Sequence, residues 1–268
     1  MKLLVTGGSG QLGRALARTH AAVALDRADL DITSPARIAA ALDTHAPTVV
    51  INAAAYTAVD RAESERAHAF AVNAEGAAHV ARACAARGIS LVHVSTDYVF
   101  DGAARRPYRE GDEASPVNAY GESKLAGERA VLAEGGTVVR TAWLFGHGGP
   151  SFVHAIARAA REQPVLRVVD DQHGCPTFAD HLAPVLIALA GRGGIWHACG
   201  EPASRYGLAL AIVEALRARC EVVPVPTAAM PTPARRPLYS VLDVGRLAQL
   251  GITLPSWRAG LSAVLETS

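Results

Sequence analysis

The feature that most constrains the fold is the regular alternation, through the first half of the chain, of short apolar runs with longer helical segments. The apolar runs are residues 2–6, 23–26, 49–53, 91–95 and 138–142. The segments with helical periodicity are residues 12–19, 35–42, 67–86 and 118–133. Each run is continuously apolar, as in strands buried on both faces. The pattern predicts an α/β fold, a doubly wound parallel sheet of the Rossmann type.

From about residue 145 the regular alternation of apolar runs and helical segments ends, and the spacing of Pro and Gly becomes irregular. We expect strands at 165–169 and 195–198 and helices at 178–190 and 206–217. The Pro-rich stretch 224–237 is excluded from helix interiors and central strands, and is predicted to cross the molecule as an ordered loop. Residues 1–145 are therefore predicted to form a dinucleotide-binding domain, to which part of the later chain returns. Residues 146–268 are predicted to form mainly a smaller substrate-binding lobe.

Composition and charge narrow the classes of partner. The 268 residues are 50% hydrophobic and carry a formal net charge of +1, so no broad field exists to bind nucleic acid or an anionic membrane. No stretch reaches the roughly 20 uncharged apolar residues of a membrane helix. The N-terminal apolar run is too short for a secretory signal, and the four cysteines form no C-x-x-C pair. We expect a cytoplasmic protein that binds neither nucleic acid nor membrane.

A glycine-rich turn follows the first strand and opens the first helix. Its sequence is TGGSGQLG, residues 6–13, which includes Gln11 and Leu12. Gly7 is predicted to make the tight turn, Gly10 to let the backbone approach a pyrophosphate, and Gly13 to let the helix pack on the sheet. The N–H groups and positive dipole end of the helix favour the phosphates. The turn predicts a dinucleotide site.

The choice between NADH and NADPH stays open at the sequence level. Asp26, at the end of the second strand, suits the ribose 2′-hydroxyl of NAD(H), whereas Arg27 beside it suits the 2′-phosphate of NADP(H). Other predicted cofactor contacts follow the second and third strands. They are Asp31 and Ile32 near the adenine, and Ala53, Ala55, Tyr56 and Thr57 after the third strand.

Three residues point to proton transfer coupled to hydride transfer. Thr96 ends the fourth strand, and Tyr120 and Lys124 are four apart on a predicted helix, so they share one face. An ammonium beside the phenol is expected to lower the pKa of Tyr120, making it a proton donor or acceptor. Thr96 is expected to bond the same substrate oxygen. His93, inside the apolar strand, is predicted to be an ordinary core histidine.

These motifs resemble the extended short-chain dehydrogenase/reductases and, within them, the dTDP-4-dehydrorhamnose reductase family. The resemblance covers nearly the whole chain. In the first half it rests on GxxGQLG at 7–13, NAAAYTAVDxAE at 52–63, STDYVF at 95–100 and YGESKLAGE at 120–128. In the second half it rests on RTAWLF at 140–145, DDQxGxPT at 170–177 and PTPARRP at 231–237.

The resemblance implies a reductase that uses NADPH or NADH on a small-molecule nucleotide sugar. The implied reaction converts the 4-keto group of dTDP-4-dehydro-6-deoxy-L-mannose to dTDP-L-rhamnose. Catalysis falls to Thr96, Tyr120 and Lys124. The implied substrate-binding residues are Thr96, Asp97, Tyr98, Trp143, Arg235 and Arg236, with the indole against the deoxysugar and the arginines neutralising the diphosphate.

One departure from the family concerns metal. Some members form a dimer around magnesium held by glutamates, one of them just after the glycine turn, where this chain has Arg14. Hard cations need oxygen ligands, so we expect no metal, and a monomer or homodimer. Two alternatives remain. One is a reductase of a related deoxyketosugar, and the other is a non-catalytic nucleotide-binding subunit, which the presence of both Tyr120 and Lys124 disfavours.

Overall fold

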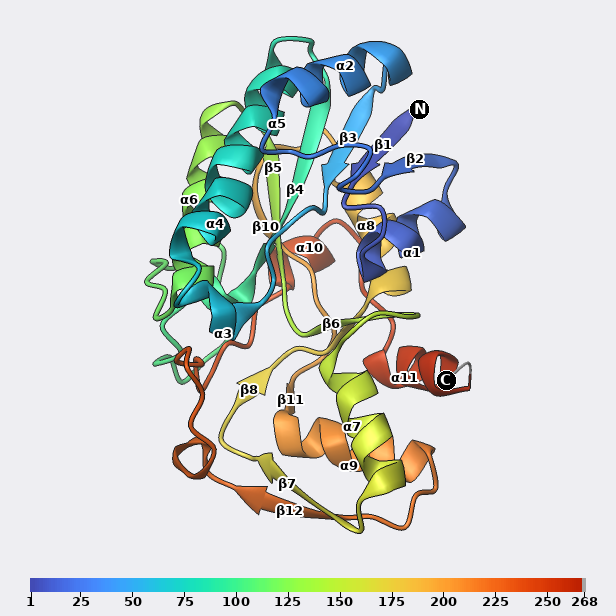
Figure 1. The fold of residues 1–268 in the computed structure, drawn as a ribbon, viewed down its shortest axis with the longest axis vertical. Helices are drawn as coiled ribbons and strands as arrows, with labels where there is room; N and C mark the ends of the chain where they lie inside the picture. The colour runs from blue at the N-terminus through green and yellow to red at the C-terminus, as the bar shows by residue number, and fades with distance from the viewer. Residues whose placement is uncertain (267–268) are drawn as a thin grey trace.

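The centre of the molecule is a six-stranded, wholly parallel sheet. A computed structural model describes residues 1–266, and in it the strand order is β10-β5-β4-β3-β1-β2 (Figure 1). The strands are β1 (Leu3–Thr6), β2 (Ala22–Leu25), β3 (Val49–Asn52), β4 (Ser90–Thr96), β5 (Thr137–Thr141) and β10 (Gly194–His197). The strand order reverses between β1 and β3, which makes this the switch point of the sheet. The predicted doubly wound parallel sheet is confirmed.

Helices cover both faces of this sheet. On one face lie α2 (Pro35–His45), α5 (Ala77–Ala85) and α6 (Ala119–Ala133), and on the other lie α1 (Gln11–Thr19) and α8 (Ala179–Ala188). Each face has its own apolar core, in which Leu16 and Leu186 are fully buried on one side and Ile38 and Val80 on the other. Because both faces are covered, the strands between them are mainly apolar, and most of their polar residues lie toward the carboxyl ends.

Strand β2 departs from the prediction that all early strands are buried. It lies at the edge of the sheet, and Val23 is 39% exposed. An edge strand has a neighbour on only one side, so its side chains are covered less completely.

The predicted single helix over residues 67–86 is interrupted. The structure has α4 (Arg66–Phe70), a π-helical segment (Ala71–Gly76), and then α5. The segment presents Asn73, whose Oδ1 accepts the Tyr56 N–H at 2.8 Å and whose Nδ2 donates to Ser123 Oγ at 2.9 Å. Such π-turns are common where a helix carries a functional side chain. The short α3 (Val59–Ala62) precedes it.

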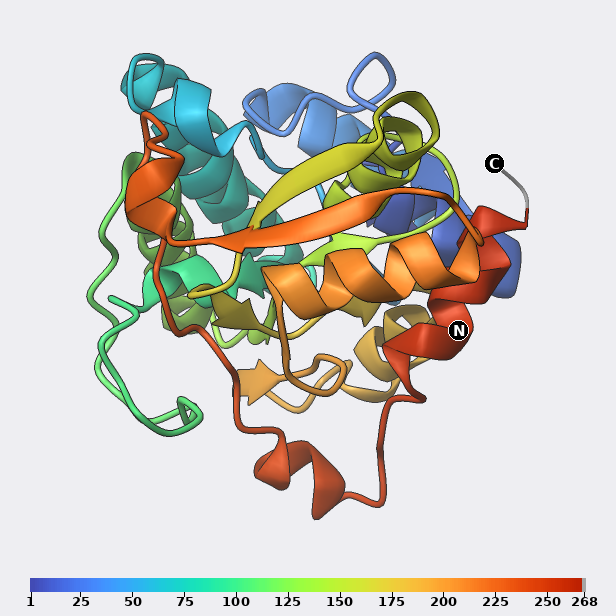
Figure 2. The ribbon, with the colours of Figure 1, turned by 90° about the horizontal axis from the view of Figure 1, so that it is seen from below.

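A smaller lobe lies beyond the carboxyl ends of the strands. Its helices are α7 (Phe152–Glu162), α9 (Arg205–Ala215) and α11 (Trp257–Leu265). Its strands pair two by two: β7 (Val165–Val169) with β12 (Glu221–Val225), β6 (Leu144–Phe145) with β9 (Thr177–Phe178), and β8 (His173–Gly174) with β11 (Ala203–Ser204). Figure 2 shows β7 and β12 side by side with α9 alongside.

The start of the Pro-rich stretch is a strand, which corrects the prediction that the whole stretch is a loop. Pro224 lies within β12, directly opposite Val168. In a two-stranded pair both strands are edges, so a residue without an N–H costs little there. Beyond it, a 3₁₀ turn (Thr227–Ala229) leads into a segment that returns to the large domain. The return includes α10 (Gly245–Ala248), which contacts β10.

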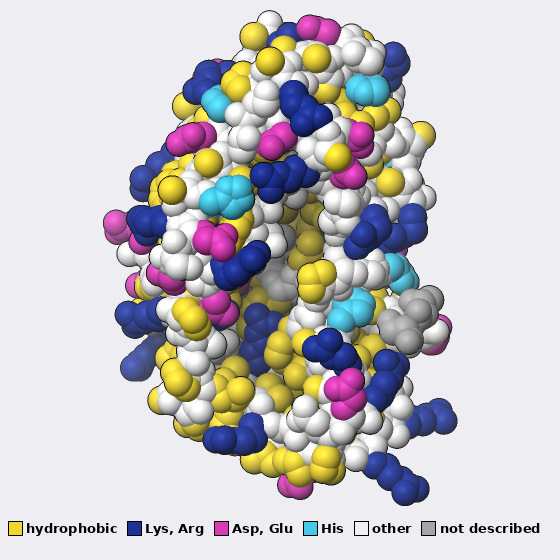
Figure 3. All heavy atoms as spheres, viewed as in Figure 1, with side chains coloured by type: hydrophobic (Ala, Val, Ile, Leu, Met, Phe, Trp, Pro, Cys, Tyr) yellow, Lys and Arg dark blue, Asp and Glu magenta, His cyan; other side chains and the backbone are white. Residues whose placement is uncertain are grey.

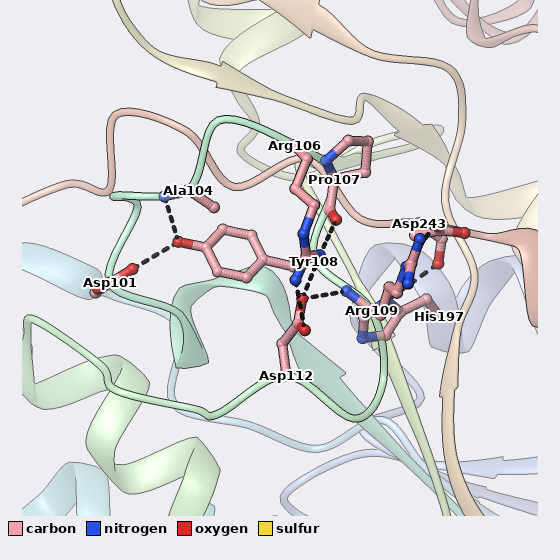
Figure 4. Close-up of polar contacts among 9 residues, drawn as sticks. All are labelled: Asp101, Ala104, Arg106, Pro107, Tyr108, Arg109, Asp112, His197 and Asp243. Carbon is pink, nitrogen blue, oxygen red and sulfur yellow. Dashed lines mark hydrogen bonds and ion pairs between the residues drawn. The ribbon is translucent and has the colours of Figure 1, made fainter.

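A long loop links the 3₁₀ turn after β4 (Asp97–Val99) to α6, and its own polar contacts hold it in place (Figure 4). Tyr108 donates its hydroxyl proton to Asp101 Oδ1 at 2.5 Å. Arg106 makes two hydrogen bonds to the Asp112 carboxylate, which holds the pKa of that carboxyl low, at about 2. Backbone hydrogen bonds join Tyr108 to Val241 and Asp243. These contacts order the loop between the end of β4 and the start of α6.

Within residues 1–266, every helix is too short or too polar to cross a membrane.

Candidate active site

A cavity of about 1250 Å³ opens where the sheet meets the smaller lobe. Its wall comes from the loops after β1, β3, β4 and β5 on one side and from α7, α9 and the residue 230–236 segment on the other. Figure 3 shows a hollow on this face, with apolar and basic side chains inside it. A crevice at the carboxyl edge, beside the switch point, is where doubly wound sheets bind nucleotides.

The glycine turn is shaped by backbone contacts that no side chain tolerates. Gly7 has φ +72°, and a Cβ there would lie 2.8 Å from Ala54 Cα. A Cβ on Gly13 would lie 2.7 Å from Gly8 Cα and closer still to Gly7 O. Gly13 therefore packs against the turn itself. At Gly10 a Cβ would meet only Gly7 O, at 3.2 Å, so this residue faces the cavity.

The N-terminus of α1 is free to receive an anion. Its N-cap, Gly10, has no side chain to accept the first-turn N–H groups, and the first intrahelical bond is made by Arg14 N to Gly10 O. The amides of residues 11–13 precede that bond and lie at the positive end of the helix dipole. Gln11 and Leu12 line the cavity here, and Gln11 Nε2 also donates to Pro150 O at 3.0 Å. The turn and helix end fit the pyrophosphate of a dinucleotide.

At the adenine end of the cavity the structure places the four predicted residues differently. Arg27, Asp31 and Ile32 line it, but Asp26 does not. Asp26 Oδ1 instead accepts the N–H groups of Ala28 and Asp29, at 2.8 and 3.1 Å, so this carboxylate caps its own turn. Arg27 lies on the cavity wall 3.6 Å from the Asp31 carboxylate, and its guanidinium is the group there that suits the 2′-phosphate of NADP(H).

Beyond β3, the predicted small residues line the cavity as expected. Ala53, Ala55, Tyr56 and Thr57 all belong to its wall. Asn73 holds this loop through the two backbone polar groups of Tyr56. The Tyr56 hydroxyl points away, donating to Glu65 Oε2 at 2.7 Å. No local sequence pattern marks Asn73, because the π-helical segment that presents it lies in an Ala-rich helical region.

Tyr120 and Thr96 come together across α6 and the end of β4. Asn118 caps α6 by accepting the Gly121 N–H at 2.8 Å. A Cβ on Gly121 would collide with Tyr98 O, so this glycine lets the first turn of the helix approach the end of the β4 strand. Tyr120 and Thr96 both line the cavity and interact through their hydroxyls. The rings of Tyr98 and Tyr120 meet edge to face, with centroids 5.9 Å apart.

The expected lowering of the Tyr120 pKa is wrong for the site as it stands. Burial raises the pKa of Tyr120 well above its usual value, and the Thr96 hydroxyl lowers it only in part. The Lys124 ammonium, which was expected to lower it, points elsewhere. Lys124 Nζ donates to Val94 O at 2.7 Å and lies 3.3 Å from His93 Nε2.

His93 is a core histidine, as predicted, but it also contacts Lys124. The Ala54 N–H donates to Thr6 Oγ1, which donates to Asn52 Oδ1 at 2.6 Å. The Asn52 amide nitrogen therefore faces His93 Nδ1, at 3.1 Å, and makes that ring nitrogen an acceptor. In the neutral ring the proton then lies on Nε2, facing Lys124.

This chain of hydrogen bonds favours the uncharged amine of Lys124. An Nε2–H group donates to an amine lone pair but cannot accept from an ammonium. Burial lowers the pKa of Lys124 to about 8, against a smaller raising effect of Glu128. Lys124 is 2% exposed, and both it and Tyr120 line the cavity. The prediction that Tyr120 and Lys124 share one face of the helix is confirmed. The pKa of about 8 means that the Lys124 amine titrates close to neutral pH.

Asp97 is buried next to Thr96 and also contributes to the cavity wall. Its Oδ1 accepts the Thr96 hydroxyl at 3.0 Å and its Oδ2 accepts the Ser240 hydroxyl at 2.5 Å. Burial raises the pKa of Asp97 to about 6, although the hydrogen bonds from Ser240 and Thr96 lower it. Asp97 therefore orients the Thr96 hydroxyl. Ser240, 143 residues away in the chain, gave no signal in the sequence.

Trp143 is held in an unusual conformation at the boundary between domain and lobe. Its φ is +45°, in the left-handed region that side chains rarely adopt. Its indole lies against Gly174, where a Cβ would be 2.6 Å from Nε1. On the ring lies the guanidinium of Arg205, with Cζ 3.6 Å from the centroid. Arg205 was not predicted as a site residue.

The two arginines of the PTPARRP segment, Arg235 and Arg236, lie in different environments. Arg236 and Tyr98 both line the cavity, and Arg236 Nη2 donates to Asp60 Oδ2 at 2.8 Å. Arg235 is exposed and outside the cavity wall, and its carbonyl accepts a hydrogen bond from Asn118. The structure brings Arg236 to the cavity but not Arg235, as expected where consecutive residues point to opposite sides.

No group of three or more His, Cys, Asp or Glu side chains placed to hold a metal ion is found in the described part of the chain. Arg14 lines the cavity beside the glycine turn.

Comparison with known proteins agrees with this geometry. The family model described as the RmlD substrate binding domain matches residues 1–268. The chain is 47% identical to the dTDP-4-dehydrorhamnose reductase of Streptomyces griseus, over 97% of this chain and 91% of that protein. It is 42% identical to the dTDP-4-keto-6-deoxy-D-glucose reductase of Streptomyces niveus, over 97% and 94%.

A solved structure has nearly the same fold. The dTDP-4-dehydrorhamnose reductase of Bacillus anthracis, in complex with NADP, superposes with a TM-score of 0.95 at 34% identity and covers 100% of both chains. The chain therefore belongs to the RmlD substrate-binding-domain family, with the dTDP-4-dehydrorhamnose reductases that it matches over nearly its whole length.

Proposed function

We propose that this chain reduces the 4-keto group of dTDP-4-dehydro-6-deoxy-L-mannose to give dTDP-L-rhamnose, the last step of dTDP-L-rhamnose synthesis. The observation that carries the proposal is one cavity that holds the glycine turn at one end and Thr96, Tyr120 and Trp143 at the other. The names of the relatives at 47% and 34% identity support the same reaction.

The cofactor fits the residues present. The amides of residues 11–13 and the open backbone at Gly10 would hold the pyrophosphate, and Arg27 would hold a ribose phosphate. When bound, the nicotinamide supplies the hydride that reduces the C4 carbonyl carbon. The relative from Bacillus anthracis was solved with NADP, and the position of Arg27 favours the same cofactor here.

Tyr120 is the proton donor in this proposal. Reduction leaves negative charge on O4, which takes the phenolic proton as the carbonyl carbon becomes a carbinol. The raised pKa of Tyr120 keeps the phenol protonated until that moment. Thr96, oriented by Asp97, places a second hydroxyl beside the same oxygen.

Lys124 acts on Tyr120 after the transfer. Once protonated, its ammonium stabilises the phenolate, and its pKa of about 8 lets it exchange protons near neutral pH. His93 and the Val94 carbonyl hold the amine in the cavity wall. Trp143 offers an apolar face to the methyl and ring carbons of a 6-deoxysugar.

The deciding experiment is the oxidation of NADPH and NADH by purified protein, with the ketosugar nucleotide made in situ and the product identified by mass and NMR spectroscopy. Formation of dTDP-L-rhamnose supports the proposal. Failure of that substrate, with cofactor binding demonstrated, overturns it.

Tyr120→Phe tests the assigned proton donor. The variant keeps the ring and its edge contact with Tyr98 but has no proton to give, so turnover should fall by about 1000-fold. NADPH affinity, measured by fluorescence titration, should stay within about twofold. Turnover above a tenth of the wild-type rate would remove Tyr120 from the mechanism.

A second candidate is reduction of dTDP-4-keto-6-deoxy-D-glucose, the substrate in the name of the relative from Streptomyces niveus at 42% identity. The two ketosugars differ in ring stereochemistry, which the wall around Trp143 must distinguish. Parallel assays with both substrates, compared by kcat/KM, separate the candidates.

We also propose a cytoplasmic, metal-independent enzyme that acts as a monomer or homodimer. In it, residues 1–145, with the later segments that return to the sheet, bind the cofactor. Most of residues 146–268 bind the substrate. The presence of Arg14 beside the glycine turn supports the absence of a metal.

A further inference from the structure

Arg205 is a half-buried cation without a carboxylate partner within the part of the chain that the structure describes. It is the first residue of α9, and its side chain lines the cavity. Of the carboxylates in residues 1–266, none lies within the 4.0 Å of an ion pair with Arg205, whereas Arg236 is paired with Asp60. Removing a charge from water is costly unless it is paired, so a half-buried, unpaired guanidinium that opens into a cavity is suited to an anionic ligand there.

Aromatic rings, rather than a carboxylate, hold this guanidinium in place. Its Cζ lies 3.6 Å from the centroid of the Trp143 ring and 4.8 Å from that of Phe152. The indole itself is fixed by its left-handed backbone and by Gly174. Stacking covers the faces of a guanidinium and leaves its N–H edges to donate hydrogen bonds.

A second guanidinium approaches the same point. The Tyr98 hydroxyl interacts with both Arg205 and Arg236. Burial lowers the pKa of Arg205, and the charge of Arg236 lowers it further, so the two cations are close enough to repel. Tyr98 and the more distant Asp97 offset this only in part. Two guanidinium groups converging on one hydroxyl form a site for an anion with several oxygens.

We propose that Arg205, with Tyr98 and Arg236, binds the diphosphate of the sugar nucleotide, so that Arg205 takes the place predicted for Arg235. The proposal rests on the proposed function for the identity of the diphosphate. The other diphosphate in the reaction, that of the cofactor, is accounted for by the N-terminus of α1 at the opposite end of the cavity. Because Arg205 also covers Trp143, it links the diphosphate to the surface against which the sugar packs.

The test compares ligands with and without phosphates. Arg205→Met keeps an unbranched apolar side chain over the indole and removes the charge. Binding of dTDP, measured by calorimetry, should weaken about 30-fold, as expected for the loss of charge-assisted hydrogen bonds. Binding of thymidine and of NADPH should change by less than about twofold. Arg205→Lys should recover part of the dTDP affinity, because it restores the charge without the planar fork.

The matched control is Arg258→Met. Arg258 also lies in the first turn of a helix and stacks on a tryptophan, 4.5 Å from the Trp257 ring, but it is exposed and is not part of the cavity wall. This variant should bind dTDP like the wild type. Circular dichroism and thermal unfolding check that both variants are folded.

Two results would overturn the proposal. The first is an equal loss of affinity for dTDP and for thymidine in Arg205→Met, which would mean that Arg205 only supports Trp143. The second is a wild-type protein that does not bind dTDP. Failure of the wild type to turn over either ketosugar, while dTDP affinity still depends on Arg205, would reject the proposed reaction and leave the anion site standing. Normal turnover with no dependence of dTDP affinity on Arg205 would support the proposed reaction and reject the anion site at Arg205.

Discussion

The two ends of the cavity are built in opposite ways. The cofactor end is made of backbone: the glycines of residues 7–13, the free amides of α1 and the small residues after β3. The substrate end is made of side chains from distant parts of the chain, among them Thr96, Trp143, Arg205 and Ser240. A backbone site is specified over a few consecutive residues, whereas a side-chain site exists only once the lobe has packed.

The largest effect is expected from a methyl group at the cofactor end. In Gly13→Ala the new Cβ collides with the backbone of Gly7 and Gly8, which cannot move without opening the turn. We expect a loss of about 3 kcal/mol in the free energy of unfolding and at least a 100-fold loss of NADPH affinity. Urea unfolding and fluorescence titration measure the two. Gly111→Ala is the control, because a Cβ there meets nothing within 4 Å. Wild-type affinity in Gly13→Ala would contradict the close packing of the turn.

The substrate end should differ from the cofactor end in its response to pH, because it contains the buried Asp97. Its pKa is about 6 in the folded chain and 3.8 when unfolded. Between these values the folded state binds more protons, so the contribution to stability is full below pH 3.8 and is lost as pH rises through 6. The loss is about 3 kcal/mol.

Asp97→Asn removes this titration. The free energy of unfolding of the variant, relative to the wild type, should therefore increase by about 2 kcal/mol between pH 4 and pH 7, because part of the full loss has already occurred at pH 4. Urea unfolding at several pH values gives this difference, and the other titrating groups cancel in it. A constant difference across the range would show that Asp97 is ionised at pH 4 in the folded chain.

Gly174→Ala adds a methyl group at the substrate end, as Gly13→Ala does at the cofactor end. The new Cβ displaces the Trp143 indole, which is a side chain and can move, so the fold should survive. We expect KM for the sugar nucleotide to rise about 20-fold, with little change in NADPH affinity. Steady-state kinetics and titration check this. Equal losses for both ligands would mean that the two ends are not independent.

The smallest effect concerns cofactor choice. Arg27 is 69% exposed in its side chain and contacts Asp31 at 3.6 Å, so it contributes a screened charge. Arg27→Met should weaken NADPH binding about tenfold and leave NADH binding unchanged, which is its internal control. A parallel loss for NADH would place the effect in the folding of the loop.

The backbone-built cofactor end was easier to predict from the sequence than the substrate end, which is built from distant side chains. The strands, the turn at Gly7 and the Tyr120–Lys124 pair were all predicted, because each is specified within a few residues. Asn73, Arg205 and Ser240 were missed, because their partners lie 17 to 143 residues away. Arg235 was chosen over Arg205 because it belongs to a recognisable string. Helix α7 was not among the predicted helices, although its start has a local signal: Ser151 caps it by accepting the His154 N–H.

The return of β10 to the central sheet has a consequence for synthesis of the chain. β10 pairs with β5, but α7, β7 and α8 are all made between them. On the ribosome, a chain that ends before His197 carries five sheet strands and an open hydrogen-bonding edge along β5. Unpaired edges of this kind invite association with other chains. The β5 edge therefore stays unpaired while the first half of the lobe emerges, and the emergence of residues 194–197 replaces it with the shorter edge of β10.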